Sequence, residues 1–189
     1  MPGSWAEAID RLPDGGHLGV LHSRASTLTQ VAERFLRVGV DRSLLPVIVA
    51  RADEAKFWIE RALPDPSDVR GGEFGLRFVP VPPRLAPAGL LPILESVSEA
   101  AVYAEDLGLR GVCIVSVLAW GVLQLGNEPL ALQAESAIEE LPFLHSLLCA
   151  CPRGAEEGGA AQVFRRLHPR LILDTKMGID LDDRVAVAP

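Results

Sequence analysis

Short, almost wholly apolar segments alternate along this chain with longer segments whose apolar residues recur at helical spacing. Uninterrupted apolar runs are typical of strands that are buried on both faces, and helices are the usual connections in a parallel sheet. The pattern therefore predicts an α/β fold of three layers, with a mostly parallel central sheet and helices on both faces. Strands are expected over residues 17–22, 46–50, 76–81, 111–118, 143–149 and 171–174, with an edge hairpin over 178–187.

The segments between these strands have the spacing of amphipathic helices. Ser4 and Glu7 have the spacing of a capping box, and Asp53 is expected to cap the third helix. No internal repeat or linker divides the chain, so residues 1–189 are expected to form one domain. Helices are expected over residues 5–12, 25–40, 53–63, 90–107, 128–141 and 160–167, and loops over 64–75 and 153–159.

Charge and composition exclude several classes of function. The chain of 189 residues has a formal net charge of −7 and no run of Lys or Arg, which argues against nucleic acid and anionic membranes as partners. The most apolar stretch, Gly111–Gly126, is shorter than the roughly 18 residues that a membrane-spanning helix needs. No secretory signal is visible, and three cysteines fit reduced thiols better than a disulfide framework. We therefore expect a cytoplasmic protein.

The junction between the first strand and the following helix resembles the position of a phosphate-binding loop, but its sequence is different. Residues 17–30 read HLGVLHSRASTLTQ and lack both the glycines and the lysine of that motif. Ser23 and Arg24 would still lie at a helix N-terminus, whose free N–H groups attract anions. Alternatively, Ser23 or Ser26 is simply the N-cap. Hydrolysis of ATP is not expected, because only Arg24 could replace the missing lysine charge.

The segment Leu171–Asp174 is an apolar strand that ends in an aspartate, as in the magnesium-binding strand of P-loop proteins. Together with Arg24, Asp174 supports an alternative prediction of a nucleotide-binding protein or weak ATPase. Four-residue patterns of this kind are common, so an aspartate that caps a turn is the competing interpretation.

His145, Cys149 and Cys151 have the same strand parity and would point to one face if the strand predicted over 143–149 continued to Cys151. With His168 they could form a set of four zinc ligands, although their spacing matches no standard zinc motif. The main expectation is therefore that the protein has no metal ion and no cofactor. Trp120 follows a core strand directly, where it either lines a pocket or packs in the core.

Three stretches of the chain together resemble a known family. The first is His17 with its strand, followed by a helix that ends in FLRVGVDRSLLPVIVA. The second is GLRGVCIVSVLAWGVLQLGNEPLALQAESAIEEL, which contains Arg110, Trp120 and Glu135. The third is LLCACPRG followed by RRLHPRLIL, in which Cys149 ends a strand and His168-Pro169 precedes another. In order and spacing, over residues 14–175, these stretches are similar to the MEDS domain, the sensory domain of methanogens, methylotrophs and the dichloromethane-dehalogenase repressor.

The resemblance implies a degenerate RecA/KaiC-like fold with the topology of P-loop NTPases, used for sensing small molecules and not for hydrolysis of ATP. It places the ligand near one functional edge of the sheet. The chain departs from the family after Cys149, where Ala150, Cys151 and Pro152 replace a Tyr-Asp pair. The residues expected to contact the ligand are His17, His22, Ser23, Arg24, Trp120, Glu135 and His168.

The sequence thus predicts a non-enzymatic sensory or regulatory domain that binds a small molecule, a signalling protein partner, or both. Two alternatives stay open. One is the nucleotide-binding protein or weak ATPase already described, and the other is a structural subunit that assembles into homo-oligomers.

Overall fold

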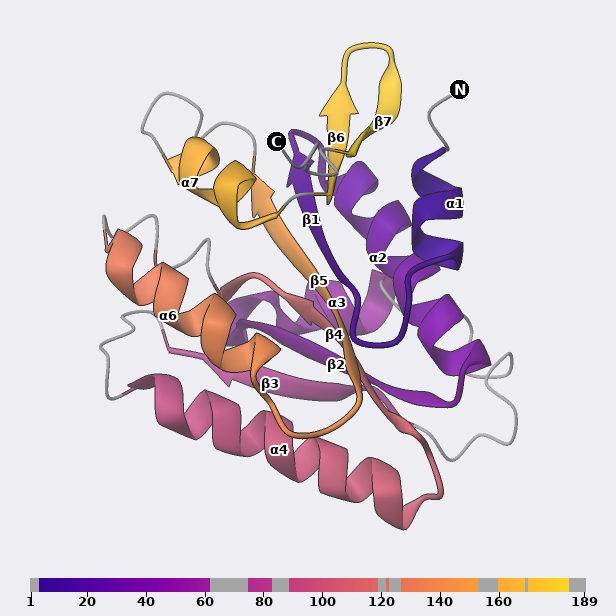
Figure 1. Ribbon diagram of the computed structural model, residues 1–189, viewed down its shortest axis with the longest axis vertical. Helices are drawn as coiled ribbons and strands as arrows, with labels where there is room; N and C mark the ends of the chain where they lie inside the picture. The colour runs from indigo at the N-terminus through magenta and orange to yellow at the C-terminus, as the bar shows by residue number, and fades with distance from the viewer. Residues whose placement is uncertain are drawn as a thin grey trace, which may run out of the picture.

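The computed structural model describes residues 4–61, 75–82, 89–118, 122, 127–152, 160–168 and 170–183. Its centre is a seven-stranded sheet of order β3-β2-β4-β5-β1-β6-β7 (Figure 1). All neighbouring pairs are parallel except β6 and β7, which form an antiparallel hairpin at one edge. The strands are β1 (His17–His22), β2 (Leu44–Arg51), β3 (Arg77–Val81), β4 (Gly111–Ser116), β5 (His145–Pro152), β6 (Arg170–Thr175) and β7 (Gly178–Asp183).

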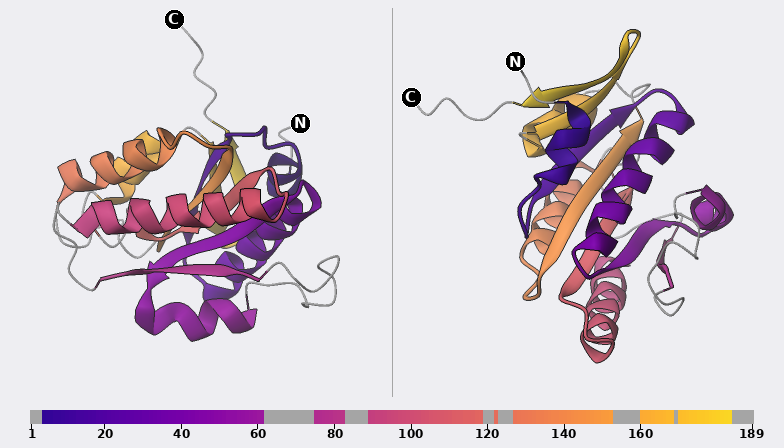
Figure 2. Two further views of the ribbon diagram at one scale, coloured as in Figure 1. Left: turned by 90° about the horizontal axis from the view of Figure 1, so that it is seen from below. Right: turned by 90° about the vertical axis from the view of Figure 1, so that its right-hand side faces the viewer.

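Helices cover both faces of this sheet, as Figures 1 and 2 show. One face carries α1 (Trp5–Asp10), α2 (Ala25–Asp41) and α3 (Ala55–Arg61), and the other carries α4 (Leu90–Asp106), α6 (Glu128–Glu139) and α7 (Ala160–Leu167). The predicted three-layer α/β architecture is therefore confirmed. Among the described residues, no helix has the length and apolar character needed to cross a bilayer.

The central strands are apolar throughout because both of their faces are buried. In β4, Cys113 and Val115 belong to the core on the α2 side, whereas Val112 and Ile114 belong to the core on the α4 side. Each fully buried Val, Leu or Ile side chain contributes roughly 1.5–3 kcal/mol relative to an exposed one. This two-sided burial explains the uninterrupted apolar runs in the sequence.

Most element boundaries agree with the sequence, and the capping box is present. Ser4 Oγ accepts from Glu7 N at 3.2 Å, and Glu7 Oε2 accepts from Ser4 N at 3.1 Å. The predicted cap at Asp53 is wrong, because Asp53 lies inside a short 3₁₀ turn and pairs with Arg51.

The largest difference between a predicted and an observed strand end is at the C-terminal end of β5, which was expected to end at Cys149. It continues through Cys151 to Pro152, because its last residues pair with Leu21 and His22 of β1. The segment expected to form an edge hairpin of its own over 178–187 instead contributes one strand, β7, which pairs antiparallel with β6, and residues 184–187 lie outside the described residues. The predicted loop 153–159 and nearly all of the predicted loop 64–75 lie outside the described residues.

Candidate functional site

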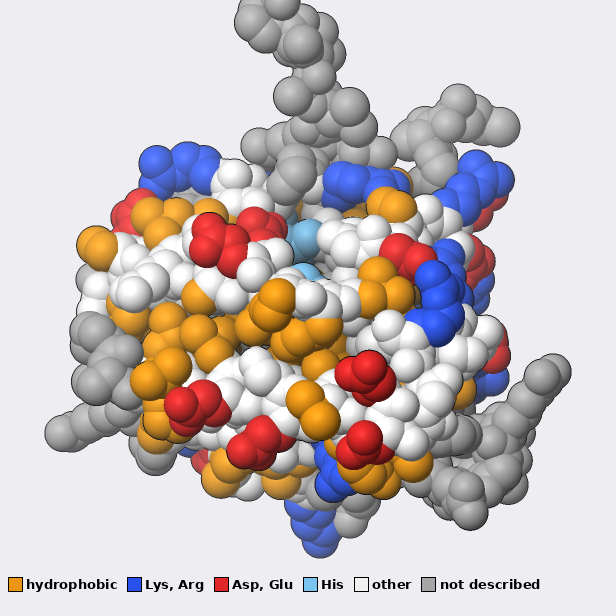
Figure 3. Space-filling view, turned by 60° about the horizontal axis from the view of Figure 1, so that its bottom comes forward, with side chains coloured by type: hydrophobic (Ala, Val, Ile, Leu, Met, Phe, Trp, Pro, Cys, Tyr) orange, Lys and Arg blue, Asp and Glu red, His pale blue; other side chains and the backbone are white. Residues whose placement is uncertain are grey.

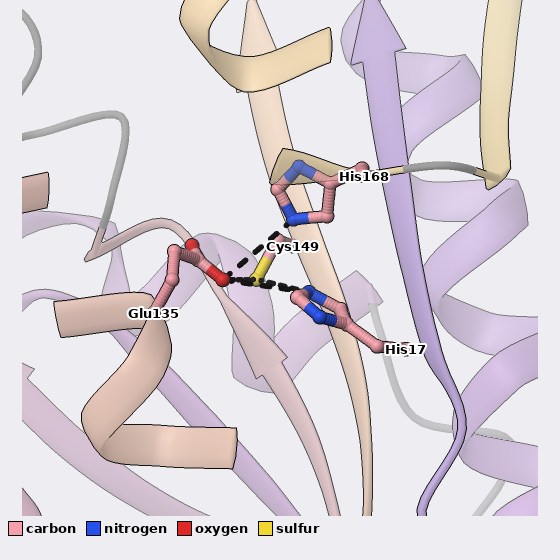
Figure 4. Close-up of side chains that lie close together, drawn as sticks. All are labelled: His17, Glu135, Cys149 and His168. Carbon is pink, nitrogen blue, oxygen red and sulfur yellow. Dashed lines mark hydrogen bonds and ion pairs between the residues drawn. The ribbon is translucent and has the colours of Figure 1, made fainter. Parts of the chain in front are cut away.

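Four side chains that are far apart in the sequence meet between the sheet and helices α6 and α7. His17 begins β1, Glu135 lies on α6, Cys149 lies on β5, and His168 follows α7 directly. One nitrogen, oxygen or sulfur atom from each lies within 4.8 Å of the other three (Figure 4). We call these residues the four-residue cluster.

The pairing of β1 with β5 places two members of the cluster. Gly19 is the register partner of Cys149, so His17 and Cys149 project toward the same face of neighbouring strands. Gly19 also makes room for a third member, because a Cβ at this position would lie 2.8 Å from the Cβ of His168. The absent side chain lets the segment after α7 approach the sheet closely.

Helix α6 supplies the carboxylates. Asn127 caps it, with Oδ1 accepting from Leu130 N at 3.1 Å. Glu135 and Glu139 are four residues apart and therefore lie on the same side of the helix. Both reach His17, at its two different ring nitrogens.

The Glu135 carboxylate is the centre of the cluster. Its Oε2 lies 3.1 Å from Cys149 Sγ, 3.4 Å from His17 Nε2 and 3.6 Å from His168 Nε2. His17 Nε2 is also 3.4 Å from Cys149 Sγ. All four functional atoms therefore face one small volume.

The cluster is largely enclosed by protein. His168 is fully buried, Cys149 is 1% exposed and Glu135 is 4% exposed. The His17 side chain, at 13% exposure, is the part nearest to solvent. In the space-filling view, histidine atoms are visible in a small hollow of this side of the molecule, beside acidic side chains (Figure 3).

The outer nitrogens of both histidines are held by protein acceptors. His17 Nδ1 lies 2.5 Å from Glu139 Oε1, and His168 Nδ1 donates to the carbonyl oxygen of Phe164 at 2.8 Å. Both Nε2 atoms consequently point inward. His168 Nε2 is buried and has no hydrogen-bond partner, since Glu135 Oε2 at 3.6 Å is beyond hydrogen-bond distance.

Burial and charge determine the protonation of the central groups. Burial raises the pKa of Glu135, but His168 and His17 outweigh it and hold the pKa below its ordinary value. Burial, followed by the adjacent Glu135 charge, raises the pKa of Cys149 well above the ordinary value of a thiol. With nothing bound, the cluster therefore contains a carboxylate next to a neutral thiol.

Two kinds of chemistry fit this set of residue types. The order Cys149, His17 and Glu139 resembles a thiol nucleophile, its base and the carboxylate that orients the base. However, a reactive cysteine needs a lowered pKa and access to substrate, and Cys149 has neither. Binding of a metal ion is the other chemistry, because thiolate, imidazole and carboxylate are all metal ligands.

A second polar group lies at the opposite end of β1. The Asp174 carboxylate accepts hydrogen bonds from Ser23 N at 3.1 Å, Ser23 Oγ at 2.9 Å, Arg24 N at 2.9 Å and Arg24 Nε at 2.9 Å. Its side chain is fully buried, and Arg24 and Ser23 hold its pKa well below the ordinary value. The Asp174 carboxylate therefore accepts hydrogen bonds from the N–H groups at the start of α2, where a P-loop protein would bind phosphate.

This arrangement decides between the interpretations of the start of α2. The N-cap is Arg24, without a side-chain cap bond, so neither Ser23 nor Ser26 is the N-cap. Asp174 supplies the missing acceptor from a distant strand. The interpretation of Asp174 as a capping aspartate is supported, and its pairing with Arg24 leaves neither group directed at a nucleotide.

The predicted ligand-contacting residues divide between these two places. His17, Glu135 and His168 belong to the cluster, whereas Ser23 and Arg24 surround Asp174. Because β-strands rise about 3.3 Å per residue, the two ends of β1 are roughly 16 Å apart. The two groups therefore lie at separate places in the fold.

His22 and Trp120 complete the predicted set. His22 ends β1 with a parity opposite to that of His17, so its side chain belongs to the α2 face. Burial lowers the pKa of His22, and the nearby Asp174 charge partly offsets that effect. Trp120 lies outside the described residues.

Of the four residues weighed as a possible zinc set, the structure brings together only Cys149 and His168. His145 and Cys149 share a face of β5, but four residues separate them by roughly 13 Å along the strand. His145 Nδ1 instead bonds the carbonyl oxygen of Phe143 at 2.9 Å, and Cys151 Sγ approaches the carbonyl oxygen of Pro152. Residues of the same parity point to the same face of a strand, but they can still be too far apart along the strand to bind one ion.

Sequence reasoning did not identify Glu139 as part of the site. Its signal was available in the i, i+4 spacing to Glu135 on a predicted helix. Arg110, which contributed to the family resemblance, lies away from the cluster and donates to Asp14 Oδ2 at 2.6 Å.

Comparisons with known proteins identify the fold. No protein-family model matches this chain, and no curated protein matches it. A prototypical ATPase from the type III secretion system of pathogenic bacteria superposes with a TM-score of 0.61 at 13% identity, over 98% of this chain and 62% of that one. An ATP synthase subunit from Nanoarchaeum equitans gives 0.59 at 10% identity, over 98% and 55%.

A KaiC-like protein from Pyrococcus horikoshii gives a TM-score of 0.50 at 12% identity, over 90% of this chain and 78% of that one. This chain spans less than two thirds of the length of each of the two ATPase-related chains, at 62% and 55%. At such low identity the likeness shows the fold, which is α/β and RecA/KaiC-like.

Proposed function

We propose that this chain is a non-enzymatic sensory or regulatory domain of RecA-like fold whose ligand binds at the four-residue cluster. The observation that carries the proposal is the convergence of His17, Glu135, Cys149 and His168 in one buried place. A buried polar group costs free energy unless a partner satisfies it, and His168 Nε2 has no hydrogen-bond partner. A bound ligand would supply that partner.

The family resemblance supports the same residues. All four members of the cluster are among the positions on which the similarity to the MEDS domain rests, although they are spread over 152 positions of the sequence. Structure and resemblance thus favour one place for the ligand, and the resemblance adds a sensory role.

The start of α2 supports the view that ATP is not hydrolysed. Its N–H groups already bond an internal carboxylate, and no lysine occupies the position needed to contact phosphates. A nucleotide would have to displace Asp174 from Ser23 and Arg24, and a buried, fully bonded carboxylate resists displacement.

The nucleotide-binding alternative has its own support. Two of the solved structures that share this fold are described as an ATPase and an ATP synthase subunit. The likeness shows a shared fold only, and the contacts of Asp174 oppose phosphate binding at the start of α2. Because the fold itself favours a nucleotide, we keep a nucleotide as the competing ligand in the experiment.

Native mass spectrometry of the purified full chain tests the proposal, with denaturing analysis of any molecule that dissociates. We expect the wild type to retain a ligand, Cys149→Ser and Glu135→Gln to lose it, and Cys151→Ser to retain it. Cys151 is a matched control because it lies on the same strand and face without belonging to the cluster. A retained nucleotide, or ATP turnover lost in Arg24→Ala, would overturn the proposal and establish the alternative.

A further inference from the structure

Given the proposed function, in which the cluster is the ligand site, we infer that the ligand is a zinc ion. The ligand atoms are Nε2 of His17, Nε2 of His168, Sγ of Cys149 and a carboxylate oxygen of Glu135. Zinc is bound in proteins by these atom types, and a set of four protein ligands is typical of its closed tetrahedral sites.

The spacing of the four atoms fits one tetrahedral ion. Zinc–ligand bonds of about 2.0–2.3 Å place neighbouring ligand atoms of a tetrahedron roughly 3.3–3.7 Å apart. The separations from Glu135 Oε2 are 3.1, 3.4 and 3.6 Å, and His17 Nε2 lies 3.4 Å from Cys149 Sγ. The other two separations, from His168 to His17 and from His168 to Cys149, are within 4.8 Å, so His168 has to approach the other ligands to surround an ion.

When both histidines are neutral, as metal ligands must be, acceptor atoms face one another in the cluster. The Phe164 carbonyl can only accept, so His168 Nδ1 carries a proton, and in the neutral ring Nε2 directs its lone pair at the centre of the cluster. The Cys149 thiol can donate to Glu135, but it cannot also satisfy His168 Nε2. A cation at the centre converts these opposing lone pairs into ligands.

The outer contacts of the histidines match those of metal-bound histidines. A histidine that binds a metal commonly donates its other N–H to a carboxylate or a backbone carbonyl, which fixes the tautomer and the ring orientation. His17 has the carboxylate of Glu139 at this position, and His168 has the carbonyl of Phe164.

Charge also favours a divalent ion. Two neutral imidazoles, the Glu135 carboxylate and a Cys149 thiolate carry a total charge of −2, which one Zn²⁺ neutralises. Neutrality matters here because an uncompensated charge in such a buried place is costly. Thiolate and imidazole ligands disfavour Mg²⁺ and Ca²⁺, which prefer oxygen.

Binding is coupled to one proton. As the Zn–S bond forms, the S–H bond of Cys149 breaks and its proton passes to the buffer, because the thiolate is the ligand.

Calorimetric titration of the chelator-treated full chain with Zn²⁺ tests this inference, together with absorption spectra after Co²⁺ addition. We expect one ion per chain, about one proton released, and a thiolate-to-cobalt charge-transfer band with the visible bands of tetrahedral cobalt. Cys149→Ser should lose the charge-transfer band and weaken binding beyond the roughly 10- to 100-fold that loss of an outer contact costs. Cys151→Ser should behave as the wild type.

Wild-type protein that binds neither ion, or a charge-transfer band that persists in Cys149→Ser, would overturn the zinc site. If Cys149→Ser does not fold, Glu135→Gln serves as the second variant, and unchanged zinc affinity in it would count equally against the site. An organic molecule retained by the wild type and lost in both variants would overturn zinc while leaving the proposed function intact. If every cluster variant retains the same ligand as the wild type, both the zinc site and the proposed function are overturned.

Discussion

The carboxylate of Asp174 accepts a hydrogen bond from the backbone N–H of Arg24 at 2.9 Å and also receives the guanidinium of the same residue. A buried side chain of β6 thus binds the start of α2 in the way that a phosphate would. This contact engages the backbone N–H groups at the start of α2, and the proposed function therefore places the ligand at the four-residue cluster instead.

Substituting Asp174→Asn should destabilise the folded chain by about 2–4 kcal/mol at pH 7, because it replaces charge-assisted hydrogen bonds with weaker ones. Urea unfolding measures the difference. The matched control is Asp53→Asn, since Asp53 pairs with Arg51 at the surface, and exposed pairs contribute only about 0–1 kcal/mol. Equal effects of the two substitutions would contradict this role for Asp174.

The contribution of Asp174 should also depend on pH. Its folded pKa lies well below the value of about 3.9 in the unfolded chain, so its stabilisation is complete above that value and declines as pH falls below it. The stability difference between the wild type and Asp174→Asn should therefore shrink between pH 5 and pH 2. A difference that stays constant over this range would show that Asp174 does not act through its charge.

Gly19→Ala should disturb the cluster through packing alone. The new Cβ would lie 2.5 Å from Leu171 Cδ2 and 2.8 Å from His168 Cβ, so His168 must move. We expect a loss of about 1–3 kcal/mol in stability and weaker zinc binding. Gly75→Ala is the control, because its Cβ would meet nothing within 4 Å. Zinc affinity equal to that of the wild type would mean that His168 is not a ligand.

Glu139 acts as a positioning residue, because it contacts His17 and not the centre of the cluster. Glu139→Gln should weaken zinc binding by roughly 10- to 100-fold while leaving the cobalt charge-transfer band in place. Calorimetry with absorption spectroscopy separates these two readouts. A lost band would place Glu139 among the ligands, and an unchanged affinity would remove it from the site.

Zinc should stabilise the folded chain against heat. A free concentration 100-fold above Kd contributes about 2.7 kcal/mol, which corresponds to roughly 5–10 °C in Tm for a chain of this size. Differential scanning calorimetry should detect this shift in the wild type and in Cys151→Ser, and no shift in Cys149→Ser. An equal shift in Cys149→Ser would assign the effect to another site.

The fold could be predicted from the sequence because its signals are local. Two-sided burial makes strands such as β4 apolar at every position, and Gly111 to Ser116 can be identified without knowledge of their neighbours. The capping box likewise depends only on Ser4 and Glu7, which are three positions apart in the sequence. The end of β5 was missed because Cys151 extends the strand through pairing with β1, which is a contact between distant segments.

The site was only partly predictable for the same reason. His17, Glu135 and His168 were identified through the resemblance, but their grouping with Cys149 depends on the register of β1 against β5 and on the space above Gly19. Neither the register nor that space follows from a single sequence. Ser23 and Arg24, which were predicted to contact the same ligand, lie at the far end of β1, where they bond Asp174.

The most direct measurement is a crystal structure of the full chain grown with Zn²⁺, with anomalous diffraction recorded on both sides of the zinc absorption edge. The account predicts one strong zinc peak between the Nε2 atoms of His17 and His168, Sγ of Cys149 and the carboxylate of Glu135, with Asp174 still bonded to Arg24. A cluster without a zinc peak, or a phosphate group bound at the start of α2 in place of Asp174, would contradict it.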